Sequence, residues 1–243
     1  MKSENNNFRM GLRDGVAIGI GYLAVSFAFG IFATSSGLSV IEAVLISMFN
    51  LTSAGQIAGL PIIASGGSLL ELALTQLVIN SRYALMSVSL SQRLSEKVSL
   101  ADRFLISFAN TDEIFAVACG KEARLGRKYF YGLVIAPFLG WTLGTLFGGI
   151  AGDILPELIV TSLSVAMYAM FIAIVVPAAK MGKSTALCIV TAVILSSVFY
   201  FTPVLNQIPS GFVIVICAVL VSLLFATVAP IENEENGEVA END

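Results

Sequence analysis

Ionisable side chains occur in the middle of long apolar stretches of this chain, where charge is expensive and usually serves a function. Arg82 has ten uncharged residues on each side, so it does not easily reach a membrane surface. Asp112 and Glu113 lie within a later apolar stretch. A carboxylate lowers the cost of placing a guanidinium in hydrocarbon, so we predict that Arg82 pairs with one of them, preferably Asp112. Such a pair either binds substrate or only locks two helices together.

A second run is polar and glycine-rich inside a hydrophobic segment. Its polar members are Asn50, Thr52, Ser53 and Gln56, and its helix-weakening members are Gly55, Gly59 and Pro61. Backbone groups of a broken helix are tolerated at membrane depth only where they face protein or water, and broken helices often hold substrate in secondary transporters. The alternative is a helix that packs closely through Gly55 and Gly59, which have GxxxG spacing. Both interpretations remain open.

Catalysis and metal binding have few candidate residues. The chain contains no histidine, which excludes Ser-His and Cys-His pairs and histidine-ligated zinc or haem. Cys119, Cys188 and Cys217 lie in apolar surroundings without CxxC spacing, so we interpret them as small hydrophobic residues. Residues 181–184 resemble the end of a phosphate-binding loop but lack its earlier glycine. We therefore predict no metal, no cofactor, no nucleic-acid partner and no enzyme activity.

These residues are embedded in a strongly hydrophobic chain. Of its 243 residues, 56% are hydrophobic and 12% are charged, about half the charged fraction of a soluble domain. Hydrophobic segments lie near 16–36, 43–65, 69–92, 104–120, 129–152, 158–179, 184–202 and 209–229. A helix satisfies its backbone hydrogen bonds internally, so we predict an all-α, polytopic membrane bundle of about eight segments.

Lysine and arginine predict the orientation of these segments, because cytoplasmic links are rich in them. They occur before the first segment, in the loop 121–128 and at 180–183, so we predict that both termini are cytoplasmic. The predicted organisation is a cytoplasmic segment 1–14, a transmembrane permease domain 15–230 and an acidic cytoplasmic tail 231–243.

The link 93–103 leaves the number of crossings open. Eight crossings would place this link outside, although it carries Arg93, Lys97 and Arg103. If 43–65 and 104–120 instead enter the membrane and return to the same side, the link lies inside and six crossings remain. In either arrangement both termini are cytoplasmic.

A weak internal echo relates two segments. Gly21-Tyr22 and Phe29-Gly30 in the first segment have the same spacing as Gly140-Trp141 and Phe147-Gly148. Transporters are often built from internal repeats, but so short an echo also arises by chance in glycine-rich sequence.

The same residues carry a resemblance to a known family. The motifs are the glycine-rich span Gly15–Gly30, Thr52-Ser53-Ala54-Gly55-Gln56, Asn80-Ser81-Arg82-Tyr83 and Thr111-Asp112-Glu113. Their order and spacing resemble the AzlC-type branched-chain amino-acid exporters of bacterial inner membranes, over residues 11–229. Ile57 and Tyr83 depart from the phenylalanine and histidine that are common there, so no histidine-based proton step is expected.

The resemblance implies export of branched-chain or similar hydrophobic amino acids, together with a small membrane subunit of the AzlD type. We therefore predict a secondary active permease subunit of the inner membrane; the alternative is a membrane scaffold or assembly subunit without its own transport site. The predicted substrate-binding or translocation residues are Asn50, Thr52, Ser53, Gly55, Gln56, Asn80, Arg82, Thr111, Asp112 and Glu113.

Overall fold

The structure is a computed structural model, and it divides into two compact units, Met1–Phe171 and Ile172–Asp243, which we describe separately. Apart from one pair of two-residue strands, the described elements are helices, which confirms the all-α prediction. Most of the predicted segment 158–179 and all of the predicted tail 231–243 lie outside the described residues. The described residues are 4–5, 7–121, 123–152, 154–156, 158, 172, 175–177, 179–180 and 182–229.

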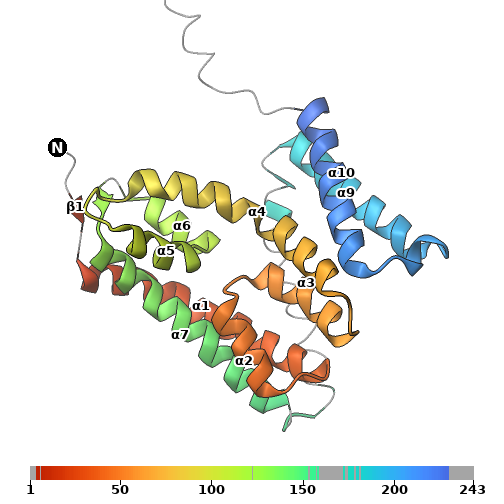
Figure 1. The fold of residues 1–243 in the computed structure, drawn as a ribbon, viewed down its shortest axis with the longest axis horizontal. Helices are drawn as coiled ribbons and strands as arrows, with labels where there is room; N and C mark the ends of the chain where they lie inside the picture. Colours follow the sequence, from red (N-terminus) through yellow and green to blue (C-terminus); the bar gives the residue numbers. More distant parts are fainter. Residues whose placement is uncertain are drawn as a thin grey trace, which may run out of the picture. The chain divides into compact units, whose positions relative to one another are not determined.

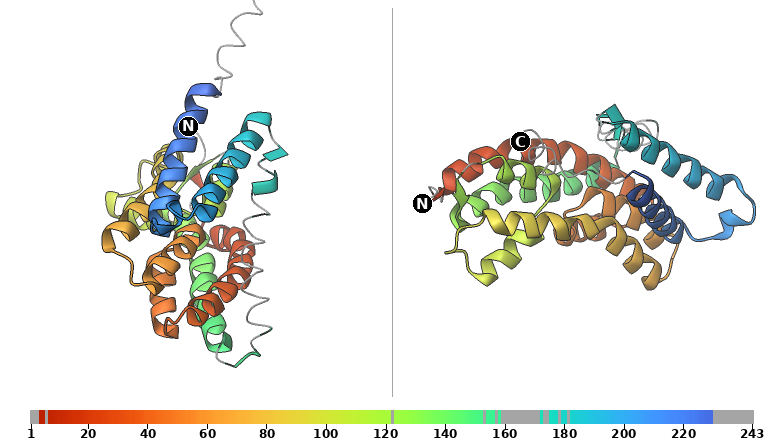
Figure 2. Two further views of the ribbon diagram at one scale, coloured as in Figure 1. Left: turned by 90° about the vertical axis from the view of Figure 1, so that its right-hand side faces the viewer. Right: turned by 90° about the horizontal axis from the view of Figure 1, so that it is seen from above.

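Two long helices, α1 (Phe8–Ser35) and α7 (Arg127–Gly152), lie side by side and run parallel in the first unit (Figures 1 and 2). Helix α1 starts before the predicted boundary at residue 15, because the Asn7 side chain caps the helix by accepting hydrogen bonds from the backbone N–H groups of Arg9 and Met10. The shared direction of α1 and α7 places the N-terminus and the loop before α7 at the same end of the unit.

Glycines line the α1–α7 contact, so the two backbones touch. A Cβ atom added at any of them would overlap atoms of the opposite helix, mostly backbone; they are Gly11, Gly15, Gly19, Gly30, Gly132, Gly140, Gly144 and Gly148. Gly21, by contrast, has open space where a Cβ would lie. Close backbone approach through small residues is how membrane helices gain packing energy without a hydrophobic driving force between them.

Both polar segments are broken into two short helices. The first consists of α2 (Val40–Phe49) and α3 (Ser53–Ala64), and the second of α5 (Leu100–Phe108) and α6 (Asp112–Cys119). The two have matching caps: Ser39 and Glu42 form a capping box on α2, as Ser99 and Asp102 do on α5. After each break a threonine, Thr52 or Thr111, caps the second half.

The break in the first segment precedes the residues that weaken its helix. Pro61 lies inside α3, near its C-terminal end. Gly55 and Gly59 instead allow α3 to approach α4 (Leu69–Arg93), because a Cβ at either position would press against the Gln76 side chain. The segment is therefore broken, but at residues 50–52, and Gly55 and Gly59 serve close packing inside α3.

The links between helices show that both broken segments return to the end from which they start. Strands β1 (Glu4–Asn5) and β2 (Arg124–Leu125) pair in parallel, and Leu94 forms a bridge to Leu125. The Ser95 N–H donates to the Leu125 carbonyl at 2.9 Å. The link 93–99 thus lies at the same end as the loop 121–126, and α5–α6 returns to that end.

The segment α2–α3 does the same from the opposite end, where α1 finishes. Leu60 of α3 lies in one buried cluster with Ala33 of α1 and Ala43 of α2. Of the two arrangements left open by the sequence, the first unit adopts the one with returning segments. Among the described helices of this unit, α1, α4 and α7 then run its full length.

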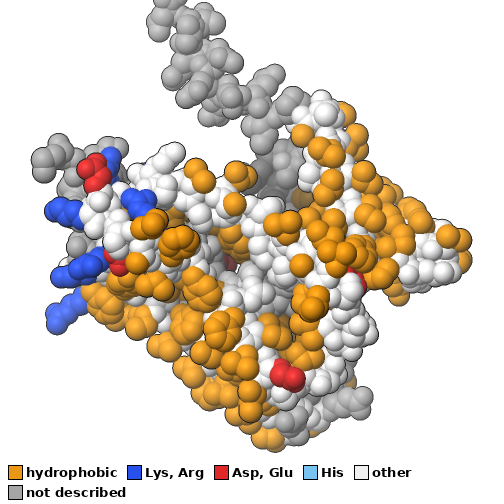
Figure 3. Space-filling view, in the orientation of Figure 1, with side chains coloured by type: hydrophobic (Ala, Val, Ile, Leu, Met, Phe, Trp, Pro, Cys, Tyr) orange, Lys and Arg blue, Asp and Glu red, His pale blue; other side chains and the backbone are white. Residues whose placement is uncertain are grey.

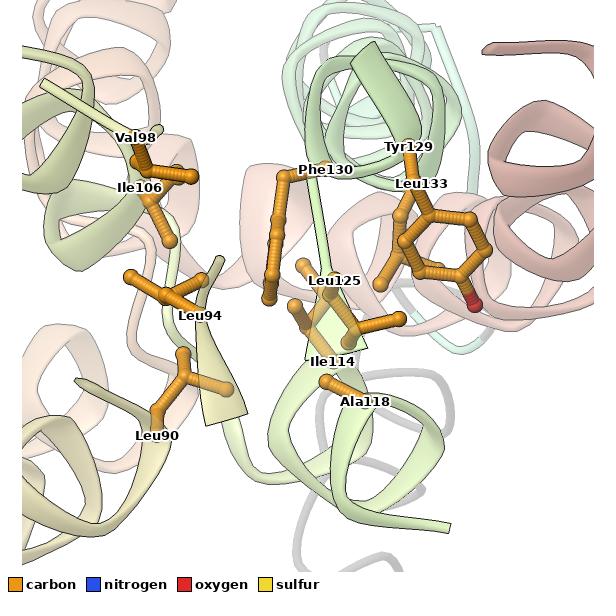
Figure 4. Close-up of a cluster of buried hydrophobic side chains, with 10 residues drawn as sticks. All are labelled: Leu90, Leu94, Val98, Ile106, Ile114, Ala118, Leu125, Tyr129, Phe130 and Leu133. Atoms are coloured by element: carbon orange, nitrogen blue, oxygen red, sulfur yellow. The ribbon is translucent and has the colours of Figure 1, made fainter. Parts of the chain in front are cut away.

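The largest buried cluster joins α4, α5, α6 and α7 at the end that carries the strand pair (Figure 4). Its members are Leu90, Leu94, Val98, Ile106, Ile114, Ala118, Leu125, Tyr129, Phe130 and Leu133. Figure 3 shows Lys and Arg side chains gathered at this end, whereas hydrophobic side chains cover much of the visible surface. Such an uneven distribution of cationic side chains is typical of helical membrane proteins.

The described part of the second unit is dominated by α9 (Lys183–Phe201) and α10 (Ser210–Val228), which pack against each other. The short 3-10 helix η1 (Leu205–Gln207) lies in the link between them. Among the described residues, α1, α7, α9 and α10 are the helices that are long and apolar enough to cross a membrane. Helix α4 has 25 residues but is less apolar.

Candidate functional site

The two helix breaks meet in the interior of the first unit. Leu51 in the first break and Ala109 in the second lie in one buried cluster with Tyr22 of α1 and Trp141 of α7. The rings of Tyr22 and Trp141 pack edge to face, with centroids 5.1 Å apart. These are the residues of the sequence echo, and the parallel packing of α1 and α7 brings them together.

Tyr22 connects α1 to the second break. Its hydroxyl donates to a carboxylate oxygen of Glu113 and lies 2.7 Å from Thr111 Oγ1. Tyr22 is 8% exposed and Thr111 is 5% exposed, so the two hydroxyl groups are buried. The predicted site residues Thr111 and Glu113 are therefore positioned from α1, which the sequence motifs did not indicate.

Trp141 connects α7 to the first break. Its indole N–H donates to Gln56 Oε1 at 3.0 Å, and Gln56 Nε2 donates to Ser47 Oγ at 3.0 Å. Ser47 and Thr145 complete this chain with hydroxyl oxygens 2.7 Å apart. A buried chain in which each polar group has a partner holds α2, α3 and α7 in one arrangement.

A second polar chain joins α3 to α4. The Thr52 hydroxyl donates to Asn80 Oδ1 at 3.2 Å, and Asn80 Nδ2 donates to Gln76 Oε1 at 3.0 Å. Gln76 Nε2 donates in turn to the Gly55 carbonyl at 2.8 Å. The predicted residues Thr52, Gly55 and Asn80 thus form one network, and Gln76 is the member that the sequence analysis missed.

The predicted ion pair between Arg82 and Asp112 is present. A guanidinium nitrogen of Arg82 lies 2.8 Å from a carboxylate oxygen of Asp112, which joins α4 to the start of α6. Arg82 also donates to the Tyr83 hydroxyl at 3.2 Å and lies 4.9 Å from the centre of its ring. Arg82 is the fourteenth of 25 residues in α4, so it lies about 20 Å along the axis from the start of that helix.

The pair is not enclosed by the first unit itself. The Arg82 and Asp112 side chains are 48% and 44% exposed. A charge pair at mid-height is unstable against acyl chains, so this face borders water or other protein. The first unit therefore contains a polar, accessible region at the level where its two broken segments meet.

The structure brings most of the predicted site residues into these connected networks. Asn50 and Ser53 flank the first break and are partly exposed. Asn110, in the second break, donates to Ser87 Oγ at 3.2 Å, and its buried Oδ1 has no hydrogen-bond partner among the described residues. Tyr22 and Trp141 are the main omissions, because aromatic residues in apolar helices usually indicate packing.

A cavity of about 220 Å³ lies elsewhere, between α4 and α5. Its lining is largely apolar and includes Leu90, Leu94 and Phe104, together with Arg103. None of the predicted site residues lines the cavity, so it is not part of the polar networks described above.

The sequence matches the model of the AzlC protein family over residues 17–155, a range that includes every predicted site residue. The chain is 33% identical over 150 residues to the inner membrane protein YgaZ of Escherichia coli K12, covering 60% of this chain and 61% of YgaZ. It is 29% identical over 180 residues to an uncharacterized membrane protein of Archaeoglobus fulgidus, covering 73% and 78% of the two chains.

A third relative is an uncharacterized membrane protein of Helicobacter pylori strain 26695, which is 24% identical over 142 residues, 57% of this chain and 61% of that protein. The matches to YgaZ and to this protein therefore span about three-fifths of those relatives. No solved protein structure matches the chain significantly.

Proposed function

Because this chain belongs to the AzlC protein family, a family of membrane proteins, we propose that it is a permease subunit that exports branched-chain or similar hydrophobic amino acids. Transport is secondary active, and the chain lies in the bacterial inner membrane with both termini in the cytoplasm. The observation that carries the proposal is the meeting of two broken helices beside the Arg82–Asp112 pair.

Broken helices supply what a transport site for amino acids needs. The start of a half-helix leaves backbone N–H groups without helical partners, and the end of a half-helix leaves carbonyl groups. These groups bind the carboxylate and ammonium of a zwitterion at little cost in reorganisation. Here the breaks at Asn50–Thr52 and Ala109–Thr111 bring both kinds of helix end to one place.

Arg82 suits the carboxylate of the substrate. Its planar guanidinium offers two parallel N–H donors, which match the two oxygens of a carboxylate. In the structure Asp112 contacts one nitrogen of this guanidinium. The remaining N–H donors of the guanidinium can hold the substrate carboxylate while Asp112 stays paired, so neither Arg82 nor Asp112 loses its counter-charge.

The exposure of the Arg82–Asp112 pair also favours the presence of a partner subunit. The small AzlD-type membrane subunit would cover part of the polar face of α4 and α6 and shield it from acyl chains. Isolated, the chain is an incomplete permease. Binding of this subunit and the choice of exported amino acid belong to the same proposal.

Efflux of radiolabelled leucine, valine and methionine from cells with and without the chain tests this function. Faster efflux in the presence of the chain, lost in Arg82→Lys at unchanged abundance, supports a permease. The scaffold alternative predicts that efflux is insensitive to Arg82→Lys, because lysine still balances Asp112 and preserves the helix contact.

A further inference from the structure

The charges at the second break do not balance. Arg82 is 2.8 Å from Asp112, and these two cancel. Glu113 is the next residue, and the described part of the chain gives it no lysine or arginine partner. With both acids ionised, this three-residue group carries one net negative charge at mid-height of the unit. An uncompensated charge there is costly, so the group needs one further positive charge.

The groups around Glu113 allow its carboxylate to bind a proton. From α1, the Tyr22 hydroxyl donates to one oxygen of Glu113, whereas the other oxygen makes no hydrogen bond or ion pair with the part of the chain that the structure describes. From α4, the titratable neighbours are Arg82, held by Asp112, and Tyr83, held by Arg82. From α7, Trp141 packs on the Tyr22 ring and carries no charge. A carboxyl group can accept a proton on its second oxygen without breaking any of these contacts.

Glu113 is also accessible, unlike the two hydroxyl groups beside it. Its side chain is exposed on the first unit, whereas Tyr22 and Thr111 are buried. A proton carrier needs this combination, because it must be fixed by the protein and must also exchange with water.

We propose that Glu113 is the coupling residue of the permease, at which a proton and the ammonium group of the amino acid compete. This inference rests on the proposed function. When the substrate binds from the cytoplasm, the O–H bond of Glu113 breaks and the proton passes to water. The ionised carboxylate then accepts hydrogen bonds from the ammonium, while Arg82 holds the carboxylate of the substrate. After release on the other side, Glu113 takes up a proton there.

Competition at one carboxylate makes the exchange obligatory. Substrate and proton cannot occupy Glu113 together, so each cycle carries one amino acid outward and one proton inward. No electrons are transferred, and no co-reactant other than the proton is required. The existing inward proton gradient would therefore drive export without nucleotide hydrolysis.

Proton release on substrate binding is the direct test. The full chain, purified with the membrane subunits that accompany it, is titrated with leucine in weakly buffered solution containing a pH dye. We expect close to one proton released per leucine where Glu113 is protonated in the empty protein. Under these conditions the apparent affinity for leucine should fall about tenfold for each unit of decrease in pH, as required by linkage.

Three variants separate the proton site from general damage. Glu113→Gln should bind leucine more weakly and release no proton. Glu113→Asp keeps the carboxylate and should restore the release. Tyr22→Phe keeps the ring but removes the donated hydrogen bond, so it should still release a proton, with a changed midpoint pH.

Each alternative result has a defined meaning. Leucine binding by the wild-type chain without proton release at any pH from about 5 to 9 overturns the assignment, as does proton release that persists in Glu113→Gln. Binding that requires sodium and releases no proton replaces the proton by a metal cation and also overturns it. If the wild-type chain binds no leucine at all, the proposed function falls as well, so the two failures are distinguishable.

Discussion

The rings of Tyr22 and Trp141 lie edge to face with centroids 5.1 Å apart, and each residue donates a hydrogen bond to a different broken segment. Tyr22 donates to Glu113 in α6, and Trp141 donates to Gln56 in α3. The two rings belong to α1 and α7, whose backbones touch. The helix pair therefore forms a support from which both broken segments are positioned.

Replacing Trp141 should loosen the first broken segment. Trp141→Phe keeps an aromatic ring but leaves Gln56 Oε1 without its indole donor, which should cost about 1–3 kcal/mol of stability. Thermal unfolding in detergent measures this, with Tyr200→Phe as the control, because Tyr200 is 70% exposed. In a Gln56→Leu background the cost of Trp141→Phe should shrink; an unchanged cost would attribute the effect to ring packing and not to the hydrogen bond.

Substitutions of the ion pair should separate transport from folding. Arg82→Lys should reduce efflux roughly tenfold or more at normal abundance, equivalent to about 1.4 kcal/mol of lost binding, since lysine lacks the two-pronged donor. Asp112→Asn should destabilise the chain by about 1–2 kcal/mol, less than for an enclosed pair because the side chains are 48% and 44% exposed.

The double variant Arg82→Gln with Asp112→Asn decides the role of the pair. It removes both charges together, so folding should recover while efflux stays absent. Normal efflux by this variant would show that the pair is structural and would move the search for the substrate site to Gly55 and Gln56.

The glycine contact between α1 and α7 predicts a sharp positional difference. Gly148→Ala should destabilise the chain by about 2–3 kcal/mol or more, because its Cβ would overlap the Phe27 carbonyl. Gly21 also lies in α1, but a Cβ there would face open space. Gly21→Ala should therefore be neutral or slightly stabilising. Equal thermal stability of the two variants would be incompatible with touching backbones.

The return of both broken segments predicts which links are accessible from which side. In a background without Cys119, Cys188 and Cys217, Lys97→Cys and Lys128→Cys should react with a membrane-impermeant maleimide only from the cytoplasm. Ser36→Cys, at the opposite end of α1, should react only from outside. Labelling of Lys97→Cys and Lys128→Cys from different sides would require α5–α6 to cross.

The proposed small subunit predicts dependence on a second gene. The chain reconstituted alone in liposomes should export little leucine, and addition of the AzlD-type subunit should restore export, because the polar face of α4 and α6 is then covered. Full export by the chain alone would contradict this part of the proposal.

The sequence predicts those parts of the fold and the site in which a charged residue occupies an unfavourable position. Arg82 in an apolar segment demands a carboxylate, and the structure provides Asp112 at 2.8 Å. Lysine and arginine at 93–103 conflict with eight crossings, and the structure resolves the conflict by returning α5–α6 to the same end. In both cases the sequence reveals an unfavourable placement of charge. The folded structure then removes it, through an ion pair in the first case and through the path of the chain in the second.

The rest depends on pairings between distant segments. Tyr22 and Trp141 resemble ordinary packing residues until α1 and α7 are placed in parallel. The role of Gln76 likewise cannot be predicted from the sequence, because it depends on the close approach of α3 that Gly55 permits. The position of the first break was also not given by its helix-weakening residues, because Gly55, Gly59 and Pro61 all fall inside α3.

The α1–α7 contact also determines when the first unit can complete its assembly during synthesis. The residues of α1 that touch α7 precede their partners by about 120 positions, as Gly11 and Tyr129 do. At a synthesis rate of about 5–20 residues per second, α1 waits roughly 6–24 s in the membrane with its glycine surface unoccupied. The broken segments are made during that interval, before the support that positions them is complete. Assembly of this unit must therefore finish late, when α7 leaves the insertion machinery and settles against the helix that entered first.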